Sequence, residues 1–195
     1  MSNESLVNKW DEHYKTASHS SASRVLLENQ HLLPTHGLAL EIACGMGNNA
    51  LLLAKQGMET HAWDISAVGI EQLQNKAQEE SLAIIGEIRD AIQDPPAAAS
   101  FDVIVVTHFL DRTLIPYLLA ALKPQGLLFY QTFTKTKIDD TGPKNPDFLL
   151  DDNELLLLCN PLHLLAYREE GQLGNVTQGF RNLAMLVGQK HQSKD

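Results

Sequence analysis

The chain has 195 residues, a length that suits one domain with a complete hydrophobic core. Its 24 Asp and Glu residues outnumber its 15 Lys and Arg residues, so the formal net charge is −9. Because the basic residues form no cluster along the sequence, this composition disfavours a nucleic-acid partner, which would need a concentrated positive surface.

Cysteine usage and the N-terminal stretch indicate a cytoplasmic protein. Cys44 and Cys159 lie far apart, and neither is near a pair of histidines at metal-ligand spacing, so we expect reduced thiols and no metal site. The stretch MSNESLVNKWDEHYK is polar, unlike a signal peptide, and the sequence holds no apolar run of about 18 residues. We therefore expect no membrane partner.

The order of apolar segments predicts an α/β fold. Two short helices, at residues 4–14 and 24–33, come first, and Pro34 ends the second. Strand-length apolar runs then alternate with segments of helical period up to residue 132, which is typical of a parallel sheet with helices on both faces. We expect strands at residues 38–42, 59–63, 83–88, 101–106 and 126–132. We expect the helices between them at residues 48–56, 67–79 and 114–122.

The pattern changes after residue 133. Gly142, Pro143 and Pro146 stand close together and predict a long crossing loop, whose residues 139–151 we expect to act as a lid. An apolar helix should begin near Asp152. Two strands near residues 162–169 and 181–189 should then pair as an antiparallel hairpin at the edge of the sheet.

The segment LALEIACGMGNNA, residues 38–50, carries the strongest functional signal. A buried strand ends in an acid, Glu41, and two glycines, Gly45 and Gly47, precede the next helix. Glycines let the backbone turn tightly and approach a ligand, and the helix directs its free N–H groups toward that ligand. Asp64 lies 17 residues after Gly47, at the end of the next expected strand, where an acid can accept hydrogen bonds from ribose hydroxyls. The pattern predicts an adenosine-containing ligand.

Charge separates two kinds of adenosine ligand. Glu41 would repel the pyrophosphate of a dinucleotide, whereas a sulfonium or an amino group tolerates a nearby carboxylate. At the end of the third expected strand, Asp90 can accept a hydrogen bond from an adenine amino group, with the Ala91 N–H nearby. Both features favour S-adenosylmethionine over a nicotinamide dinucleotide.

The order and spacing of these motifs resemble the class I S-adenosylmethionine-dependent methyltransferases, especially the small bacterial branch that includes the tellurite-resistance methyltransferases. The similarity covers nearly the whole chain, through the stretches WDEHY, EIACGMGNNA, AWDIS, RDA, FDVI and LKPQG. It implies a single Rossmann-like domain with a seven-stranded, mostly parallel sheet whose last strand is antiparallel. It also implies S-adenosyl-L-methionine as cofactor and methyl transfer to a small-molecule substrate, without a metal.

The resemblance implies cofactor contacts along the strand ends. The contacts implied for the methionine part of the cofactor are Ala43, Cys44, Gly45 and Gly47, with Thr107 beside the sulfonium. Asp64 is implied for the ribose, Ile65 for the adenine face, and Asp90 and Ala91 for the adenine edge. Glu41 and Tyr14 complete the expected cofactor-binding set. Many relatives carry Arg where this chain has Asn48, so the substrate of the branch does not transfer to this chain.

His108 is the one candidate catalytic residue. It follows the fourth expected strand, at the edge where ligands bind in open α/β folds. No paired acids and no Asp-His pair follow that strand, which favours a soft or anionic nucleophile that arrives without a proton to remove. We therefore expect His108 to contact the acceptor or form a wall, and not to act as an obligatory base.

Other polar and aromatic side chains have a structural interpretation beside the functional one. We expect Cys44 to fit the turn as a small residue and not to act as a nucleophile. Arg112 should pair with Asp111 or face solvent before it would clamp an anionic substrate. Trp10 and Tyr14 lie one helical turn apart, so they either close over the cofactor or attach their helix to the body of the protein.

Two other functions share parts of this pattern. A nicotinamide-dependent oxidoreductase would have the same glycine turn and Asp64, although Glu41 argues against it. A non-catalytic S-adenosylmethionine-binding module would keep the pocket and methylate nothing. Titration with NAD(H) and with S-adenosylmethionine distinguishes an oxidoreductase from a methyltransferase. A test for acceptor methylation distinguishes a binding module from an enzyme. The sequence sets neither the acceptor nor the oligomeric state.

We expect one methyltransferase domain made of three segments. Residues 1–36 form an N-terminal helical cap, residues 37–132 form the cofactor-binding core, and residues 133–195 hold the lid loop, a helix and the C-terminal hairpin.

Overall fold

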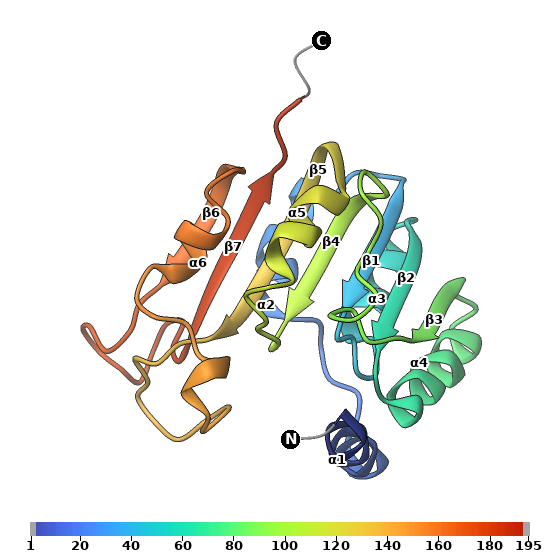
Figure 1. Cartoon of the computed structure of the whole chain (residues 1–195), viewed down its shortest axis with the longest axis horizontal. Helices are drawn as coiled ribbons and strands as arrows, with labels where there is room; N and C mark the ends of the chain where they lie inside the picture. Colours follow the sequence, from blue (N-terminus) through green and yellow to red (C-terminus); the bar gives the residue numbers. More distant parts are fainter. Residues whose placement is uncertain (1–2, 193–195) are drawn as a thin grey trace.

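Seven strands form one sheet in the computed structural model, which describes residues 3–192 (Figure 1). The strands are β1 (Leu38–Ile42), β2 (Glu59–Asp64), β3 (Ile84–Ile88), β4 (Phe101–Thr107), β5 (Leu122–Phe133), β6 (His163–Glu169) and β7 (Leu183–Gln189). Their order across the sheet is β3-β2-β1-β4-β5-β7-β6. The strands β1 to β5 pair in parallel, whereas β7 pairs antiparallel with both β5 and β6. The predicted seven-stranded sheet, with its antiparallel last strand and its hairpin, is confirmed.

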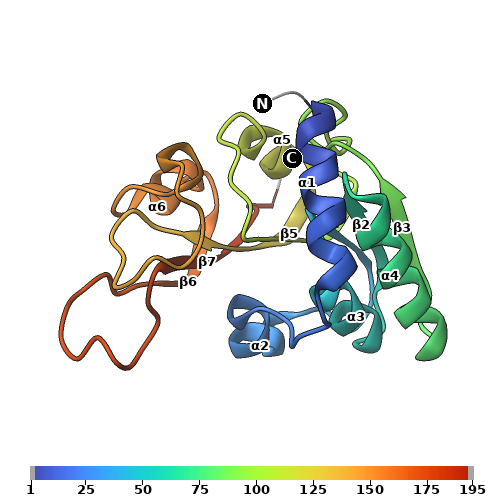
Figure 2. The same ribbon diagram turned by 90° about the horizontal axis from the view of Figure 1, so that it is seen from below.

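Helices cover both faces of this sheet. The helices are α1 (Asn3–Thr16), α2 (Arg24–Asn29), α3 (Asn48–Lys55), α4 (Ala67–Glu79), α5 (Ile115–Ala121) and α6 (Glu154–Leu158), with short 3-10 turns η1 (Gln30–Leu32) and η2 (Pro146–Phe148). The helices α5 and α6 pack on one face, and α2, α3 and α4 pack on the other (Figure 2). The helix α1 crosses the end of the sheet (Figure 2).

The central strand β4 shows why the sequence gives buried strands here. Val103 and Val105 enter the core with α2 and α3, while Ile104 and Val106 enter the core with α5 and α6. All four side chains are fully buried. A strand covered on both faces is apolar at every position, so β4 lacks the alternation of a half-exposed strand.

The start of β5 corrects the sequence-based boundary. The predicted helix ran to residue 122, with a Lys-Pro-Gln-Gly turn before a strand at residue 126, but α5 ends at Ala121 and β5 begins at Leu122. Phe101 pairs with Leu122 and Val103 with Leu127, so the extra residues form an irregularity in the ladder. Within it Gln125 has a positive φ of 65°. Such a bulge accommodates Pro124, which has no N–H to donate to a regular ladder.

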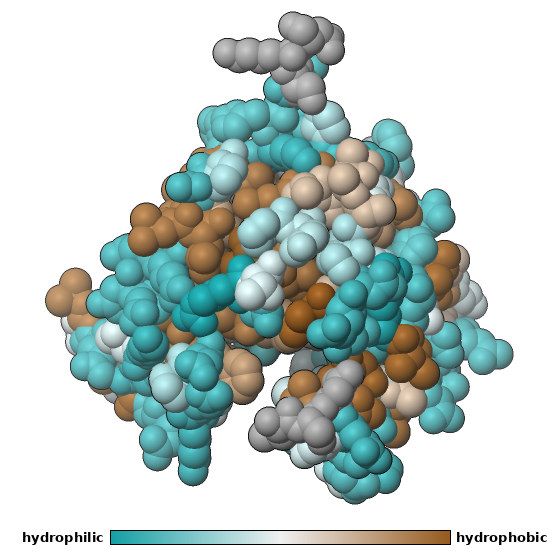
Figure 3. All heavy atoms as spheres, in the orientation of Figure 1, coloured by the Kyte–Doolittle hydropathy of each residue, from teal (hydrophilic) through white to brown (hydrophobic). Residues whose placement is uncertain are grey.

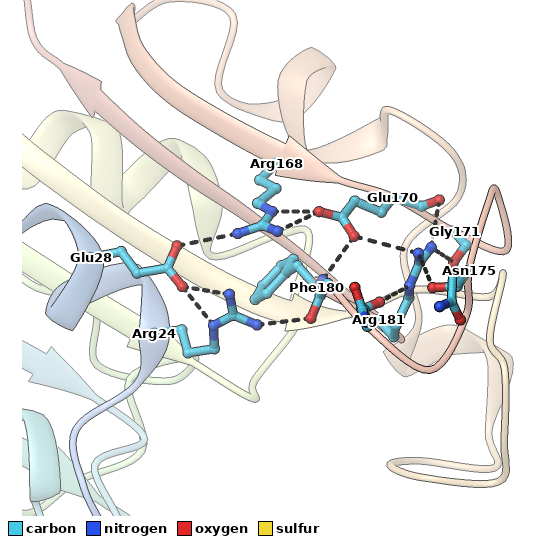
Figure 4. A network of polar contacts seen from close by, with 10 residues as sticks. Arg24, Glu28, Arg168, Glu170, Gly171, Asn175, Phe180 and Arg181 are labelled. Atoms are coloured by element: carbon cyan, nitrogen blue, oxygen red, sulfur yellow. Dashed lines mark hydrogen bonds and ion pairs between the residues drawn. The ribbon is translucent and has the colours of Figure 1, made fainter.

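An arginine–aromatic cluster attaches α2 to the C-terminal hairpin (Figure 4). Phe180 is 1% exposed, and the guanidinium groups of Arg24 and Arg168 lie 4.9 and 5.7 Å from its ring centroid. Glu28 pairs with Arg24 at 2.5 Å and with Arg168 at 3.5 Å. The contacts join segments more than a hundred residues apart in the sequence.

Within residues 3–192, no helix combines the length and the apolar character that crossing a bilayer requires.

Candidate cofactor and active site

The carboxyl ends of the five parallel strands meet at one edge of the sheet, and α1 lies along that edge (Figure 1). Two non-glycine residues that directly follow parallel strands at this edge have positive φ angles, Ala43 after β1 at 51° and His108 after β4 at 56°. Each costs roughly 1–3 kcal/mol relative to ordinary backbone, and such residues cluster at ligand sites. The backbone therefore marks the ends of β1 and β4.

The glycines of the β1–α3 turn make room for protein side chains. Gly45 and Gly47 have φ angles of 54° and 70°. A Cβ on Gly45 would lie 2.5 Å from the hydroxyl oxygen of Tyr14, and a Cβ on Gly47 would overlap the side chain of Leu73. The empty Cβ positions thus accept side chains of α1 and α4, and the expected contact of this turn with the cofactor stays a prediction.

Glu41 holds the start of α3. Its side chain is 2% exposed. The Asn49 side-chain amide donates to one carboxylate oxygen and the Ala50 backbone N–H to the other, both at 2.7 Å. The same Asn49 nitrogen lies 3.0 Å from the Thr107 hydroxyl. Glu41 thus acts on its surroundings through its charge and through Asn49, which links β1, α3 and β4.

Asp64 closes the glycine turn from the end of β2. Its carboxylate accepts hydrogen bonds from the backbone N–H groups of Gly45 at 2.7 Å and Ser66 at 2.8 Å. Each carboxylate oxygen has two lone-pair positions, so these two bonds leave acceptor capacity for further donors. The sequence-based pairing of the glycine turn with Asp64 is present in the structure.

The helix α1 covers this turn with Tyr14. Asp11 accepts hydrogen bonds from the Ser66 hydroxyl at 2.5 Å and the Val68 N–H at 3.3 Å, and Gln72 donates to the Tyr14 carbonyl at 2.6 Å. These bonds fix α1 on the first turn of α4. The Trp10 and Tyr14 rings stack with centroids 5.8 Å apart.

The ionisable groups of the site are mostly acidic and buried. Burial raises the pKa of Glu41 to about 8, against the opposing hydrogen bonds from Asn49 and Ala50. Burial also raises the pKa of Asp64. Burial raises the pKa of Tyr14, and the charge of Asp64 adds to the effect. The Cys44 thiol is buried and its pKa is well above the usual range, as an inert small residue in the turn requires.

These groups fit a cationic ligand. Among the contacts of residues 3–192, neither Glu41 nor Asp64 has a Lys or Arg partner. Burial raises the pKa of both carboxyls, so a sulfonium or an ammonium group beside them would favour their ionised forms, whereas a pyrophosphate would oppose that ionisation. The donor set therefore suits S-adenosylmethionine.

The end of β3 lies on the other side of β2. Asp90 accepts a hydrogen bond from the Ile92 N–H at 3.0 Å, which shapes the turn after this strand. Ala91 is 7% exposed and packs into the core, while Ile65 is half-buried. Their expected adenine contacts stay predictions.

His108 and Thr107 lie at the end of β4, next to β5. Thr107 is buried and His108 is exposed. Burial of the ring lowers the pKa of His108, and because solvent still reaches the residue we expect this shift to be small. On this edge the molecular surface is hollowed between α1 and the loop that contains η2 (Figure 3). The hollow is the candidate site for a second substrate.

Arg112 does not pair with Asp111, nor does it simply face solvent. Its guanidinium binds the carboxylate of Glu154 at 2.6 and 2.8 Å and the carbonyls of Asp147 and Leu149 at 2.6 and 3.0 Å. Asp111 instead accepts hydrogen bonds at the turn before α5. The sequence-based pairing was wrong because Glu154 is 42 residues away, and local spacing carries no signal for that contact.

Two buried amides in the site were missed from the sequence. Asn49 is 3% exposed and Gln131 is 2% exposed. Besides its bonds to Glu41 and Thr107, Asn49 accepts the Ser23 N–H at 2.8 Å, and Gln131 accepts the Val25 N–H at 2.9 Å. Only the position of Asn49 in the turn motif, directly after Asn48, could have suggested it.

Comparison with known proteins identifies the domain. Residues 39–126 match the family described as a methyltransferase domain. The chain is 30% identical over 112 residues to the ubiquinone biosynthesis O-methyltransferase of Histophilus somni (strain 2336), across 52% of this chain and 47% of that protein. It is 30% identical over 107 residues to the protein of the same name from Actinobacillus pleuropneumoniae serotype 5b (strain L20), across 50% and 46%. The chain spans about half the length of the curated relatives it matches.

Solved structures share the fold across most of the chain. TehB from Haemophilus influenzae superposes with a TM-score of 0.70 at 21% identity, covering 94% of this chain and 66% of that one. A SAM-dependent methyltransferase from Methanosarcina mazei superposes with a TM-score of 0.67 at 18% identity, covering 89% and 100%. A methyltransferase domain in this fold implies S-adenosylmethionine as the cofactor. Residues 39–126 therefore match a methyltransferase domain, and the chain has the fold of these solved structures, in agreement with the α/β fold that the sequence predicted.

Proposed function

We propose that this protein transfers a methyl group from S-adenosylmethionine to a small-molecule acceptor whose nucleophile is soft or already anionic. The observation that carries the proposal is the buried acidic turn, in which Glu41 and Asp64 converge under Tyr14 without a cationic partner among the described residues. The relatives named as O-methyltransferases make an ionised oxygen the first acceptor class to test.

The residues divide the work of binding. Asp64 would hold the ribose hydroxyls with its remaining acceptor positions, and Asp90 with Ala91 would meet the adenine edge. Glu41 would contribute negative charge below the turn once a bound cation favours its ionised form. Tyr14, seated on Gly45, would exclude water from the methionine side of the pocket. When bound, S-adenosylmethionine supplies a methyl group that is already a strong electrophile.

Positioning is the main task of the protein in this proposal. Holding two reactants in a near-attack arrangement supplies about 7–11 kcal/mol of a barrier. Thr107 and His108 would border the path between cofactor and acceptor at the end of β4. The hollow between α1 and the loop that contains η2 would admit the acceptor (Figure 3). An acceptor that is already anionic needs no general base.

An acceptor screen tests the proposal. Purified protein is incubated with methyl-labelled S-adenosylmethionine and a panel of phenols, catechols, thiols and chalcogen anions at several pH values. We expect label to enter one acceptor class, with the rate following the ionised fraction of the nucleophile. Cofactor binding without labelling of any acceptor class would instead identify a non-catalytic binding module.

A nicotinamide-dependent oxidoreductase is the competing proposal. It would need the pyrophosphate of its cofactor beside the buried Glu41 carboxylate, where like charges repel. Hydride transfer to or from NAD(H), followed by its absorbance, would support it over methyl transfer.

A further inference from the structure

His108 leaves β4 in a fixed arrangement against β5. Its backbone has a φ of 56°, and its N–H donates to the Gln131 carbonyl at 2.8 Å. Its ring lies against the Phe133 ring, with centroids 5.3 Å apart at 41°. The imidazole Nε2 lies 3.4 Å from the side-chain nitrogen of Gln131. His108 thus faces β5 with its Nε2 edge.

The Gln131 side chain has only one possible orientation. The oxygen Oε1 lies 2.9 Å from the backbone nitrogen of Val25, at the start of α2. A backbone N–H can only donate, so the atom facing Val25 must be the amide oxygen. The NH2 group of Gln131 therefore faces His108.

This orientation sets the tautomer of His108. An amide NH2 only donates, so the Nε2 atom opposite it must accept and carries no proton. At 3.4 Å the bond itself is weak, but a protonated Nε2 would place a second donor against the NH2 group of Gln131, a residue that is only 2% exposed. The neutral ring then carries its proton on Nδ1. The other ring contact among the described residues is Phe133, which like Gln131 belongs to β5 and is uncharged.

We propose that Gln131 is a positioning residue that holds His108 as the neutral, Nδ1-protonated imidazole, so that His108 offers the methyl acceptor a hydrogen-bond donor and no base. This inference rests on the proposed function for the acceptor, while the tautomer belongs to the free protein. The donor would orient the acceptor through an oxygen beside the attacking atom, because a hydrogen bond to the attacking lone pair would weaken it as a nucleophile. The geometry suits an acceptor with a charged oxygen next to its nucleophile.

The tautomer is measured first, by long-range ¹H–¹⁵N correlation spectroscopy of the uniformly labelled free protein, with His108 assigned by the loss of its signals in His108→Asn. We expect a protonated Nδ1 and a bare Nε2 at neutral pH. A protonated Nε2, or a cationic ring at neutral pH, would overturn the inference. This readout needs no acceptor, so it separates a failure here from a failure of the proposed methyl transfer.

The Gln131→Glu variant tests the cause. Glutamate keeps an oxygen for the Val25 N–H and replaces the donor opposite Nε2 with a charged acceptor. The proton should move to Nε2, and the pKa of His108 should rise by about 1 or more, because an adjacent carboxylate favours the charged imidazole. The control is Gln56→Glu, the same chemical change at an exposed position at the end of α3. An unchanged tautomer and pKa in folded Gln131→Glu would show that Gln131 does not govern His108.

Steady-state kinetics with the acceptor found by the screen test the donor role. His108→Ala should raise the acceptor KM about tenfold with little change in kcat. His108→Asn should restore most of the loss, because the Asn amide supplies a donor and tolerates a positive φ. A large fall in kcat for His108→Ala, or no recovery in His108→Asn, would count against a donor that orients the acceptor.

Discussion

At the scale of single residues, the glycines of the β1–α3 turn leave space for neighbouring side chains, in addition to their proposed role in cofactor binding. Gly45 receives Tyr14 of α1, and Gly47 receives Leu73 of α4. The turn therefore couples the position of α1 to the backbone that would border the proposed cofactor site. A substitution here should disturb folding and binding together.

Gly45→Ala separates steric conflict from backbone strain. Gly174 has a φ of 74° with no atom within 4 Å of its missing Cβ, so Gly174→Ala should cost about 1 kcal/mol of unfolding free energy from strain alone. Gly45→Ala should cost about 1–3 kcal/mol more, because its Cβ would overlap Tyr14. Denaturant titration measures both. If the two variants are equally stable, Tyr14 does not rest on Gly45.

Glu41 should couple cofactor binding to protons. Its pKa is raised to about 8 in the free protein, so it is mostly neutral below that pH, and a cationic ligand favours its ionised form. Binding of S-adenosylmethionine should release a proton, and its affinity should rise with pH up to about 8 and then level off. Titration calorimetry in buffers of different ionisation enthalpy measures the proton count.

S-Adenosylhomocysteine is the matched control ligand, because it lacks the sulfonium charge. Its affinity should depend less on pH. Equal proton release with both ligands would mean that the sulfonium charge does not change the pKa of Glu41.

The residue scale also shows where sequence reasoning failed. Glu41, Gly45 and Asp64 were placed together from spacing alone, because a strand end and the next strand end meet at one sheet edge. The partner of Arg112 was missed, because Glu154 reaches it through the tertiary fold. Gln131 was missed for a similar reason, since a polar side chain inside an apolar strand gives no hint of which groups it satisfies.

At the scale of elements, α1 lies over the β1–α3 turn and is held against α4 by hydrogen bonds. Asp11 binds the Ser66 hydroxyl and the Val68 N–H, next to the N-cap bond that Ser66 itself accepts from Gly69 at 3.1 Å. Ser66 therefore holds both α1, through Asp11, and the first turn of α4, through the Gly69 N–H. Loosening α1 should affect binding more than global stability.

Asp11→Ala should weaken S-adenosylmethionine binding about fivefold and speed hydrogen exchange in α1, because hydrogen bonds of this kind contribute about 1 kcal/mol. The matched control is Glu12→Ala, whose partner is the exposed Lys15 at 2.5 Å on the same helix. Calorimetry and exchange mass spectrometry give the two readouts. Equal effects in both variants would show that the Asp11 contacts contribute nothing specific to cofactor binding.

The loop of residues 139–151 should respond to ligands in only part of its length. Arg112 fixes the carbonyls of Asp147 and Leu149, so closure would move the preceding residues. With S-adenosylhomocysteine and acceptor bound, exchange in residues 139–146 should slow while residues 147–151 stay protected. Arg112→Gln should speed exchange in residues 147–151, whereas Lys144→Gln in the same loop should not. Uniform exchange with and without ligands would make this loop a structural crossing and not a lid.

Element boundaries were predictable where local pattern and tertiary structure agree. The strand at residues 38–42 was predicted with its observed bounds, because it is a short run that is apolar apart from Glu41 and lies between turn signals. The start of β5 was wrong by four residues, since its irregular pairing with Phe101 depends on a neighbouring strand and not on its own composition.

At the scale of the whole molecule, the carboxyl ends of the parallel strands form one edge of the sheet, and the segments that border this edge come from distant parts of the chain. The helix α1 closes one side and the loop with η2 borders the other (Figures 1 and 3). The cluster around Phe180 ties α2 to the C-terminal hairpin (Figure 4).

Isothermal titration of the free protein with S-adenosylmethionine, S-adenosylhomocysteine and NADH under one set of conditions is the decisive measurement. We expect saturable binding of the first two at one site per chain and no comparable binding of NADH, because Glu41 and Asp64 have no cationic partner among the described residues that could neutralise a pyrophosphate, and a pyrophosphate would disfavour their ionised forms. Folded Asp64→Ala should lose about 1.5–3 kcal/mol of S-adenosylmethionine affinity, since it removes a charged acceptor of hydrogen bonds. Tighter binding of NADH, or unchanged S-adenosylmethionine affinity in Asp64→Ala, would contradict a sulfonium cofactor held at this acidic turn.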